Sequence, residues 1–197
     1  MISPPYISEL IDGIELSNEM QFHLLSHFIE TDKNYINLFT KETNYTKTEI
    51  IGQLKKPGSK FFKSFANNPI HLVQKIEETL STSKIIVSEH AQRLKIEIIV
   101  NQLKFPDGIG WNTIIHKDDL LNIDNIKVVE IQRGGFILKS VNIEKPITCQ
   151  FNIVFENKEL KTIFPGIYAP PFLNKEMQTS TFYKMCADFW QKHLIIN

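Results

Sequence analysis

Two histidines stand where polar segments meet stretches that favour β-strands. His90 lies in the sequence SEHAQR, between two β-rich stretches, and His116 lies in the segment FPDGIGWNTIIHKDD. Functional groups are commonly presented at such junctions of loops and strands. An imidazole can also accept or donate a proton near neutral pH. We therefore treat His90 and His116 as candidates for a general base and a general acid.

A cation and a hydroxyl group extend this set. Arg133 is expected at the tip of a hairpin beside two glycines, and Thr162 lies in the last predicted strand. Cleavage of RNA without a metal ion needs a base for the 2′-hydroxyl proton and an acid for the 5′-oxygen leaving group. Positive charge and hydroxyl donors stabilise the transition state. We predict that Arg133 and Thr162 join the two histidines in catalysis, while a structural role for each residue stays open.

The segment Phe164–Phe172, with the sequence FPGIYAPPF, is the most distinctive run in the chain. Its three prolines and one glycine restrict the backbone, and its aromatic side chains supply flat apolar surface. It either packs over the end of a sheet as a rigid loop or offers a stacking surface for an unpaired base. As substrate-binding residues we predict Tyr168 in this segment, together with Trp111 and Lys139.

The remaining histidines and motifs argue against several other kinds of chemistry. His23 and His27 stand four residues apart, a spacing that suits a metal pair on one helix face, but no third ligand follows nearby. We interpret them as flanking an apolar stripe, and His71 and His193 as structural residues near helix ends. The sequence contains no P-loop, GxGxxG, GxSxG or HExxH motif. We expect no metal ion and no cofactor.

The amino-acid composition limits the kinds of protein to which this chain can belong. Of the 197 residues, 42% are hydrophobic and 11% aromatic, which supports a packed core in one domain, or in a domain with a smaller helical attachment. No apolar run approaches the roughly 18 residues of a membrane span, and the N-terminus lacks the features of a signal peptide. We expect a cytoplasmic protein, or one delivered into the cytoplasm of a target cell. Cys149 and Cys186 are expected to be small buried side chains.

Charge is distributed unevenly along a chain whose net charge is zero. Residues 1–50 carry three Lys and eight Asp+Glu, a net −5, and residues 51–197 carry nineteen Lys+Arg and fourteen Asp+Glu, a net +5. Ordinary solvated surfaces explain this, and so does a basic domain with an acidic helical attachment. A basic surface would suit a polyanion such as RNA.

The periodicity of apolar residues changes near residue 81. Helices are predicted over residues 17–40, 46–56, 69–80 and 179–195, and strands over residues 84–88, 93–101, 126–132, 136–141, 148–156 and 159–164. Short turns between successive strands imply antiparallel pairing. The predicted class is α+β: N-terminal helices, then a four- to five-stranded antiparallel sheet and a C-terminal helix. We divide the chain into an acidic helical region, residues 1–67, and a helix-plus-sheet domain, residues 68–197.

This order of elements, and the end of the last strand, resemble a group of bacterial toxins. The strand ends in the step Thr-Ile-Phe-Pro at residues 162–165. Over roughly residues 68–172, the layout resembles the barnase, EndoU, colicin and RelE-like ribonuclease toxin domains. The resemblance implies metal-independent cleavage of RNA, often of tRNA, and neutralisation by a cognate immunity protein. It does not extend to residues 1–60 or to the last helix.

Two functional hypotheses follow. The first is a ribonuclease toxin domain, in which His90 and His116 act as acid and base, while Arg133 holds a phosphate. Thr162 then donates a hydrogen bond from its hydroxyl group. The second is a non-catalytic interaction protein, such as an immunity protein or a subunit of a bacterial assembly. The neutral net charge, the acidic first fifty residues and the aromatic, proline-rich segment favour this second hypothesis.

Overall fold

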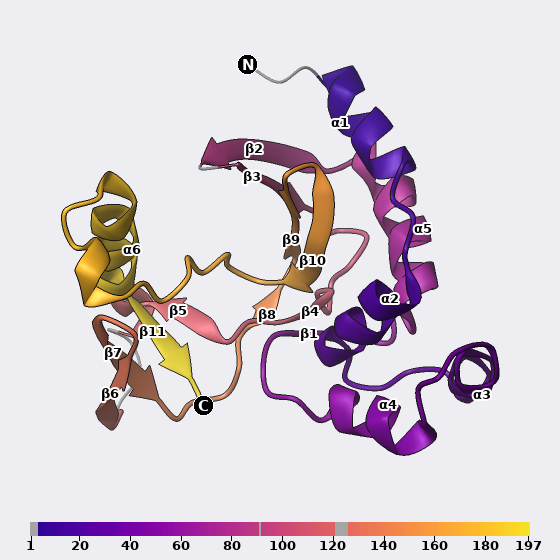
Figure 1. Cartoon of the computed structure of the whole chain (residues 1–197), viewed down its shortest axis with the longest axis horizontal. Helices are drawn as coiled ribbons and strands as arrows, with labels where there is room; N and C mark the ends of the chain where they lie inside the picture. Colours follow the sequence, from indigo (N-terminus) through magenta and orange to yellow (C-terminus); the bar gives the residue numbers. More distant parts are fainter. Residues whose placement is uncertain (1–3, 91, 121–125) are drawn as a thin grey trace. The chain divides into compact units, whose positions relative to one another are not determined.

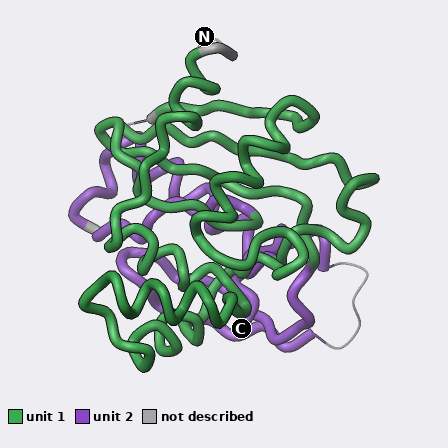
Figure 2. The backbone as a smooth tube through the Cα atoms, turned by 90° about the vertical axis from the view of Figure 1, so that its right-hand side faces the viewer, with its two compact units in different colours: residues 1–111, 147–166 green, residues 112–146, 167–197 purple. Residues whose placement is uncertain are grey.

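The computed structural model describes residues 4–90, 92–120 and 126–197. The chain forms two compact units, coloured separately in Figure 2: unit 1 contains residues 1–111 and 147–166, and unit 2 contains residues 112–146 and 167–197. This division differs from the predicted one at residue 68, because residues 1–67 share unit 1 with many of the strands that follow them.

Helices dominate the first eighty residues. They are α1 (Pro4–Asp12), α2 (Asn18–Leu24), α3 (Lys33–Glu42), α4 (Lys47–Leu54) and α5 (Pro69–Leu80), with η1 (Leu25–His27) a turn of 3-10 helix after α2. The helix predicted over residues 17–40 is interrupted, because Phe28 is extended and forms a β-bridge with Phe61. Asp32 then caps α3 by accepting a hydrogen bond from the Asn34 N–H at 2.8 Å.

The local signals for α4 and α5 match their observed boundaries. At the start of α4, Thr46 and Glu49 form a capping box in which each side chain accepts a hydrogen bond from the other residue's backbone N–H. Asn68 caps α5, and Pro69 occupies its first turn, where the missing N–H of proline has no cost. None of the described helices is long and apolar enough to cross a membrane.

Strands and a final helix make up most of the remaining chain. The strands are β1 (Lys60–Phe61), β2 (Lys84–His90), β3 (Arg93–Ile99), β4 (Gly110–Trp111), β5 (Ile114–His116), β6 (Val128–Arg133), β7 (Phe136–Val141), β8 (Ile147–Thr148), β9 (Gln150–Glu156), β10 (Glu159–Pro165) and β11 (His193–Ile196). The other helices are η2 (Lys117–Leu120), η3 (Lys175–Met177) and α6 (Thr181–Lys192). The predicted α+β class, with helices first, antiparallel strands next and a C-terminal helix, is confirmed, and the described strands lie in three sheets.

Unit 1 contains two of these sheets. The larger has the strand order β10-β9-β3-β2 with antiparallel pairing throughout, and the smaller has the order β1-β4-β8. In the larger sheet, the buried side chains of Ile96, Ile153 and Ile163 are neighbours in register. They share a core cluster with side chains from α1, α2 and α5, and α1 lies beside α5 in Figure 1. Burial of this apolar face is the main stabilising term for unit 1.

Unit 2 is built on a mixed sheet with the strand order β5-β11-β7-β6. The last strand, β11, pairs antiparallel with β5 and parallel with β7. Helix α6 contacts β7, and its buried residues Cys186 and Trp190 share a core cluster with Leu138. The helix predicted over residues 179–195 ends at Lys192, since His193 has the extended dihedrals φ −119° and ψ 155°. This switch from helix to strand positions the candidate site described below.

Candidate functional site

The four predicted catalytic residues divide between the two units. His90 and Thr162 lie in unit 1, on β2 and β10, which are the two edges of its four-stranded sheet. Three interstrand spacings, roughly 14 Å, therefore separate their backbones. His116 and Arg133 lie in unit 2, likewise on the two edge strands of one sheet. The catalytic roles of the four residues stay predictions. The side chain of His90 lies outside the described part of the structure.

His116 has a second histidine beside it. His193, on β11, is its direct partner in the antiparallel register of β5 and β11. The two imidazole rings lie 5.0 Å apart between centroids, at an interplanar angle of 88°. We call His116 and His193 the edge pair. The sequence assigned His193 a structural role, and the available signal for strand β11 was the apolar run Leu194–Ile196 that follows it.

His193 is held in one orientation and in one tautomer. Its ring stacks on Phe189 at 3.9 Å between centroids, with 8° between the planes. Its Nδ1 lies 2.8 Å from the carbonyl oxygen of Phe189, and a carbonyl only accepts, so Nδ1 carries the proton. Neutral His193 therefore has its lone pair on Nε2. Burial, as the largest cause, lowers the pKa of His193, with smaller contributions from the charges of His116 and Lys192.

His116 has a partner for its Nδ1 in both protonation states. The backbone N–H of Asp118 donates to Nδ1 at 3.3 Å when that nitrogen carries a lone pair. The carboxylate oxygen Oδ2 of the same residue lies 3.4 Å from Nδ1 and accepts from it when the ring is protonated. Nδ1 is thus engaged on the Asp118 side, and Nε2 is the nitrogen left for proton transfer.

A row of aromatic side chains connects the edge pair to Arg133. Phe189 meets Trp190 edge-on at 5.1 Å between ring centroids, and Trp190 stacks on Phe172 at 5.0 Å. The guanidinium carbon of Arg133 lies 5.9 Å from the centroid of the Phe172 ring. Phe172, one of the aromatic residues of the segment FPGIYAPPF, is therefore in contact with both Trp190 and Arg133. These contacts fix the ring on which His193 stacks.

Thr162 lies in a different cluster, in unit 1. Its Oγ1 is 3.2 Å from Nε2 of His23 and 3.2 Å from Nε2 of His27. The helical spacing of the two histidines places both on the side that faces β10, where the strand register shifts between Leu160 and Thr162. Such irregularities re-aim a strand side chain. We call His23, Thr162 and His27 the relay triad.

The direction of each hydrogen bond in the relay triad follows from its inner end. Nδ1 of His27 lies 3.4 Å from the carbonyl oxygen of Ser59 and must donate to it. Neutral His27 then accepts the hydroxyl proton of Thr162 at Nε2. The same Thr162 oxygen accepts the Nε2–H of His23. Both ring nitrogens of His27 and the hydroxyl of Thr162 are consequently engaged within the protein.

Burial disfavours the charged form of both histidines in the relay triad. Burial lowers the pKa of His27 to about 3, aided by the nearby charges of His23 and Lys60. Burial also lowers the pKa of His23, with Lys56 as the second cause. His23 borders an open cavity of about 740 Å³ whose lining includes four glutamates and two lysines. An excess of carboxylates makes this cavity a poor place for a phosphate.

The predicted substrate-binding residues come from both units. Trp111, in unit 1, donates from Nε1 to the carbonyl oxygen of Gly58 at 3.3 Å and meets Phe62 edge-on at 6.0 Å between centroids. Lys139, in unit 2, is exposed on β7, directly opposite Glu130 of β6. Tyr168, also in unit 2, is half-buried. Their binding roles stay predictions.

Neither a metal centre nor a relative points to a function. Among the described residues, no group of three or more His, Cys, Asp or Glu side chains is arranged to hold a metal ion. Cys149 and Cys186 are free thiols, the first half-buried and the second buried. A scan against protein-family models, a search of curated proteins and a search of solved structures found no match to this chain. The chemistry of the two histidine clusters is therefore the basis for a functional proposal.

Proposed function

We propose that the chain is a metal-independent ribonuclease of the bacterial toxin type, with the edge pair as its acid and base. The observation that carries this proposal is the arrangement of His116 and His193, two imidazoles 5.0 Å apart on adjacent strands. One has its proton fixed on Nδ1 by a backbone carbonyl, and the other has a carboxylate at Nδ1. His193 thus takes the place of His90 as the second histidine.

In the proposed reaction, neutral His193 takes the proton of a ribose 2′-hydroxyl at Nε2. The 2′-oxygen attacks the adjacent phosphorus, and the bond from phosphorus to the 5′-oxygen breaks. His116, protonated at the start, gives its Nε2 proton to the 5′-oxygen, while its Nδ1–H stays hydrogen-bonded to Asp118. The products are a 2′,3′-cyclic phosphate and a 5′-hydroxyl. Protons and electrons balance without a metal ion or other co-reactant.

Positive charge around the edge pair is local. Lys117 and Lys192 each neighbour one of the two histidines in sequence, and Nζ of Lys117 donates to the carbonyl oxygen of Gln191. Unit 2 as a whole carries eight Lys+Arg and seven Asp+Glu, a net +1. The proposal therefore depends on single lysines to stabilise the transition state rather than on a broad basic face. Arg133 then contacts a phosphate elsewhere along the RNA strand.

The test is incubation of the purified full chain with tRNA, total RNA and a matched DNA strand, in the presence of a chelator. RNA is expected to be cleaved with 2′,3′-cyclic phosphate ends, and DNA is expected to stay intact because it lacks the 2′-hydroxyl. His116→Ala and His193→Ala should each slow cleavage at least about 100-fold, the usual scale of general acid–base catalysis. His71→Ala is the matched control, because the His71 ring hydrogen-bonds to Asn67 at the start of α5 and belongs to neither histidine cluster.

Three results would each remove the proposal. They are intact RNA after prolonged incubation, equal cleavage of DNA, and cleavage that survives both edge-pair substitutions while circular dichroism shows a folded chain. Expression of the chain in a bacterial cytoplasm tests the toxin aspect separately. Growth should stop with wild type and continue with His193→Ala.

A second candidate is a non-catalytic interaction protein, such as an immunity protein or an assembly subunit. The near-neutral charge of both units favours it. Unit 1 carries fourteen Lys+Arg and fifteen Asp+Glu, so the acidic first fifty residues offset the basic ones within the same unit. A neutral surface is less suited to RNA than to a protein partner. This candidate is favoured if the purified chain does not cleave RNA and if a pull-down recovers one protein partner in a stoichiometric amount.

A further inference from the structure

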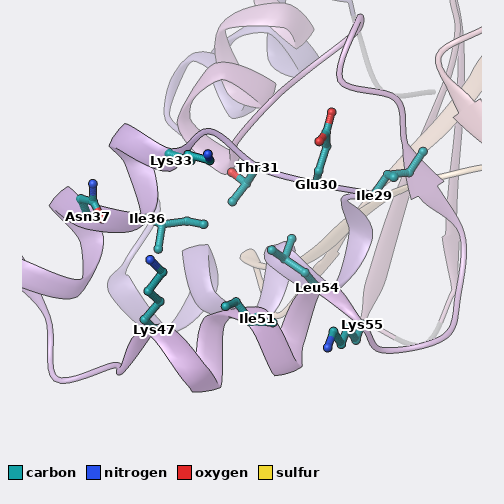
Figure 3. A pocket seen from close by; sticks show the side chains of 10 residues that line it. All are labelled: Ile29, Glu30, Thr31, Lys33, Ile36, Asn37, Lys47, Ile51, Leu54 and Lys55. Carbon is teal, nitrogen blue, oxygen red and sulfur yellow. The ribbon is translucent and has the colours of Figure 1, made fainter.

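An open apolar hollow of about 500 Å³ lies between α3, α4 and the segment before α3. Figure 3 shows the side chains of Ile36, Ile51 and Leu54 facing it. Ile29 and Ile51, which also line it, are 40% and 37% exposed. A hollow with aliphatic walls offers space for an apolar side chain of another molecule.

Three lysines surround the hollow. Lys33 comes from α3, Lys47 from the start of α4 and Lys55 from its end, and Figure 3 places them on different sides of the aliphatic floor. Within the described residues, none of the three forms an ion pair. The carboxylate that also lines the hollow, Glu30, is already paired with Lys63 at 3.3 Å. The hollow therefore combines an apolar floor with three uncompensated positive charges.

Two of these lysines occupy helix positions that are electrostatically unfavourable for a positive charge. Lys33 is the first residue of α3 and Lys47 is the first residue of α4. The start of a helix carries the positive end of the macrodipole and favours acidic side chains. Asp32 and Glu49 already supply a carboxylate to the first turns of α3 and α4, but neither forms an ion pair with Lys33 or Lys47 among the described residues. The ammonium groups at the rim of the hollow therefore remain available to an acidic occupant.

The spacing of the lysines indicates what kind of anion fits. Lys47 and Lys55 are separated by the full length of α4, and eight residues of α-helix rise roughly 12 Å. One carboxylate head group cannot contact both. Several carboxylates distributed around an apolar side chain can contact all three lysines, and an amphipathic acidic peptide has this pattern.

We propose that this hollow binds an acidic, amphipathic segment of a partner protein. An apolar side chain of that segment packs against Ile36, Ile51 and Leu54, and its carboxylates pair with the surrounding lysines. The site lies in unit 1, whereas the edge pair lies in unit 2. The proposal therefore does not depend on RNA cleavage, and a His193→Ala chain should bind the same peptides.

The experiment uses a displayed library of random twelve-residue peptides, selected on the purified full chain. Individual peptides are then synthesised and their Kd is measured by fluorescence anisotropy. Selected peptides are expected to combine Asp or Glu with Leu, Ile, Met or an aromatic residue. The triple substitution Lys33→Glu, Lys47→Glu, Lys55→Glu should raise Kd at least tenfold, because three attractive charges become repulsive. Ile51→Ser should raise it as well, through loss of apolar contact.

A matched control separates the hollow from the overall charge of the chain. Lys41, Lys84 and Lys104 are also exposed lysines of unit 1, and reversing all three changes the net charge by the same amount. This control should leave Kd within about twofold. The proposal is overturned if no peptide is selected, if selected peptides lack acidic residues, or if both triple variants weaken binding equally. Binding of dodecanoate or single-stranded RNA at the three lysines, with no peptide binding there, overturns it too.

Discussion

In unit 1, His27 has hydrogen-bond partners for both ring nitrogens, whereas in unit 2 each histidine of the edge pair has partners only for Nδ1 among the described residues. Both clusters bring two imidazoles together. In the relay triad, the hydroxyl of Thr162 has two imidazole partners. Burial lowers the pKa of His27 to about 3, so His27 is neutral near pH 7. The edge pair leaves two Nε2 atoms for a ligand.

This difference separates histidines that hold a fold together from histidines that can react. A buried imidazole with every nitrogen engaged loses stability when it changes protonation state. A half-buried imidazole with one engaged nitrogen keeps its orientation and can still transfer a proton at the other. His27 of the relay triad meets the first description and the edge pair meets the second. Residue type and the number of nearby histidines do not distinguish them, but the hydrogen-bond partners do.

The largest expected difference follows from replacing one histidine of each cluster by asparagine and measuring both the rate of RNA cleavage and the free energy of unfolding. His193→Asn should reduce RNA cleavage by at least about 100-fold, on the scale of general acid–base catalysis, with little loss of stability. His27→Asn should lower the free energy of unfolding by about 1–3 kcal/mol, because its partners lose a hydrogen bond. Its cleavage per folded molecule should be unchanged.

Urea denaturation followed by circular dichroism gives the stability, and a fluorogenic RNA gives the rate. The assigned roles of His27 and His193 are contradicted if His27→Asn abolishes cleavage at full stability and His193→Asn only lowers the free energy of unfolding. His71→Asn again serves as the neutral control for loss of an imidazole outside both clusters.

Thr162→Val tests the hydroxyl at the centre of the relay triad. Valine retains the shape of threonine but can neither donate to His27 nor accept from His23. We expect a loss of about 1–3 kcal/mol in the free energy of unfolding, the range for leaving buried polar groups unpaired. Thr162→Ser retains the hydroxyl and should lose less. If Thr162→Val instead stops cleavage at full stability, then Thr162 acts on the substrate, as the sequence predicts.

The pH dependence of stability tests the protonation state of His27. Its pKa in the folded chain is about 3, against about 6.5 when unfolded. Between these values the unfolded state binds more protons, so stability rises with pH and falls as the solution is acidified from 6.5. The slope is up to about 1.4 kcal/mol per pH unit. His27→Asn removes this term, so the wild-type advantage should shrink from pH 7 to pH 4.5 in urea titrations. An advantage that is constant over this range would contradict the pKa.

Local sequence signals account for the elements whose causes are local. Asn68-Pro69 predicts the start of α5, and the glycine at position 134, which has φ +57°, predicts the turn between β6 and β7. The break in the first predicted helix has a tertiary cause, because Phe28 pairs with Phe61. The short strand β11 likewise owes its existence to pairing with β5 and β7. Such pairings leave no periodic pattern in four residues.

The histidine clusters also depend on contacts between residues far apart in the chain, which the sequence pattern does not show. His116 stands where a loop meets a strand, and the sequence predicts it as a proton-transfer residue. Its neighbour His193 follows a helix and reaches His116 only through strand register. Thr162 is 135 residues from His27 in the chain. Spacing along one helix indicates that His23 and His27 lie together, but not that a hydroxyl from another element lies between them.

Arg133→Ala gives the smallest expected effect and tests the far end of the aromatic row. If Arg133 only covers Phe172, its loss should cost about 0.5–1 kcal/mol of stability, the range for an exposed cation–π contact, and leave RNA cleavage nearly unchanged. If it also holds a phosphate of the substrate, KM should rise several-fold while kcat changes little, because a contact remote from the reacting bond contributes equally to ground-state and transition-state binding.

Arg133→Lys separates the two roles. Lysine keeps a charge for a phosphate but loses the planar group that stacks on the ring, so it should restore KM without restoring stability. A fall in kcat comparable to that of His193→Asn would instead place Arg133 at the reacting phosphate, and the division of unit 2 into an edge pair and a supporting row would have to be abandoned.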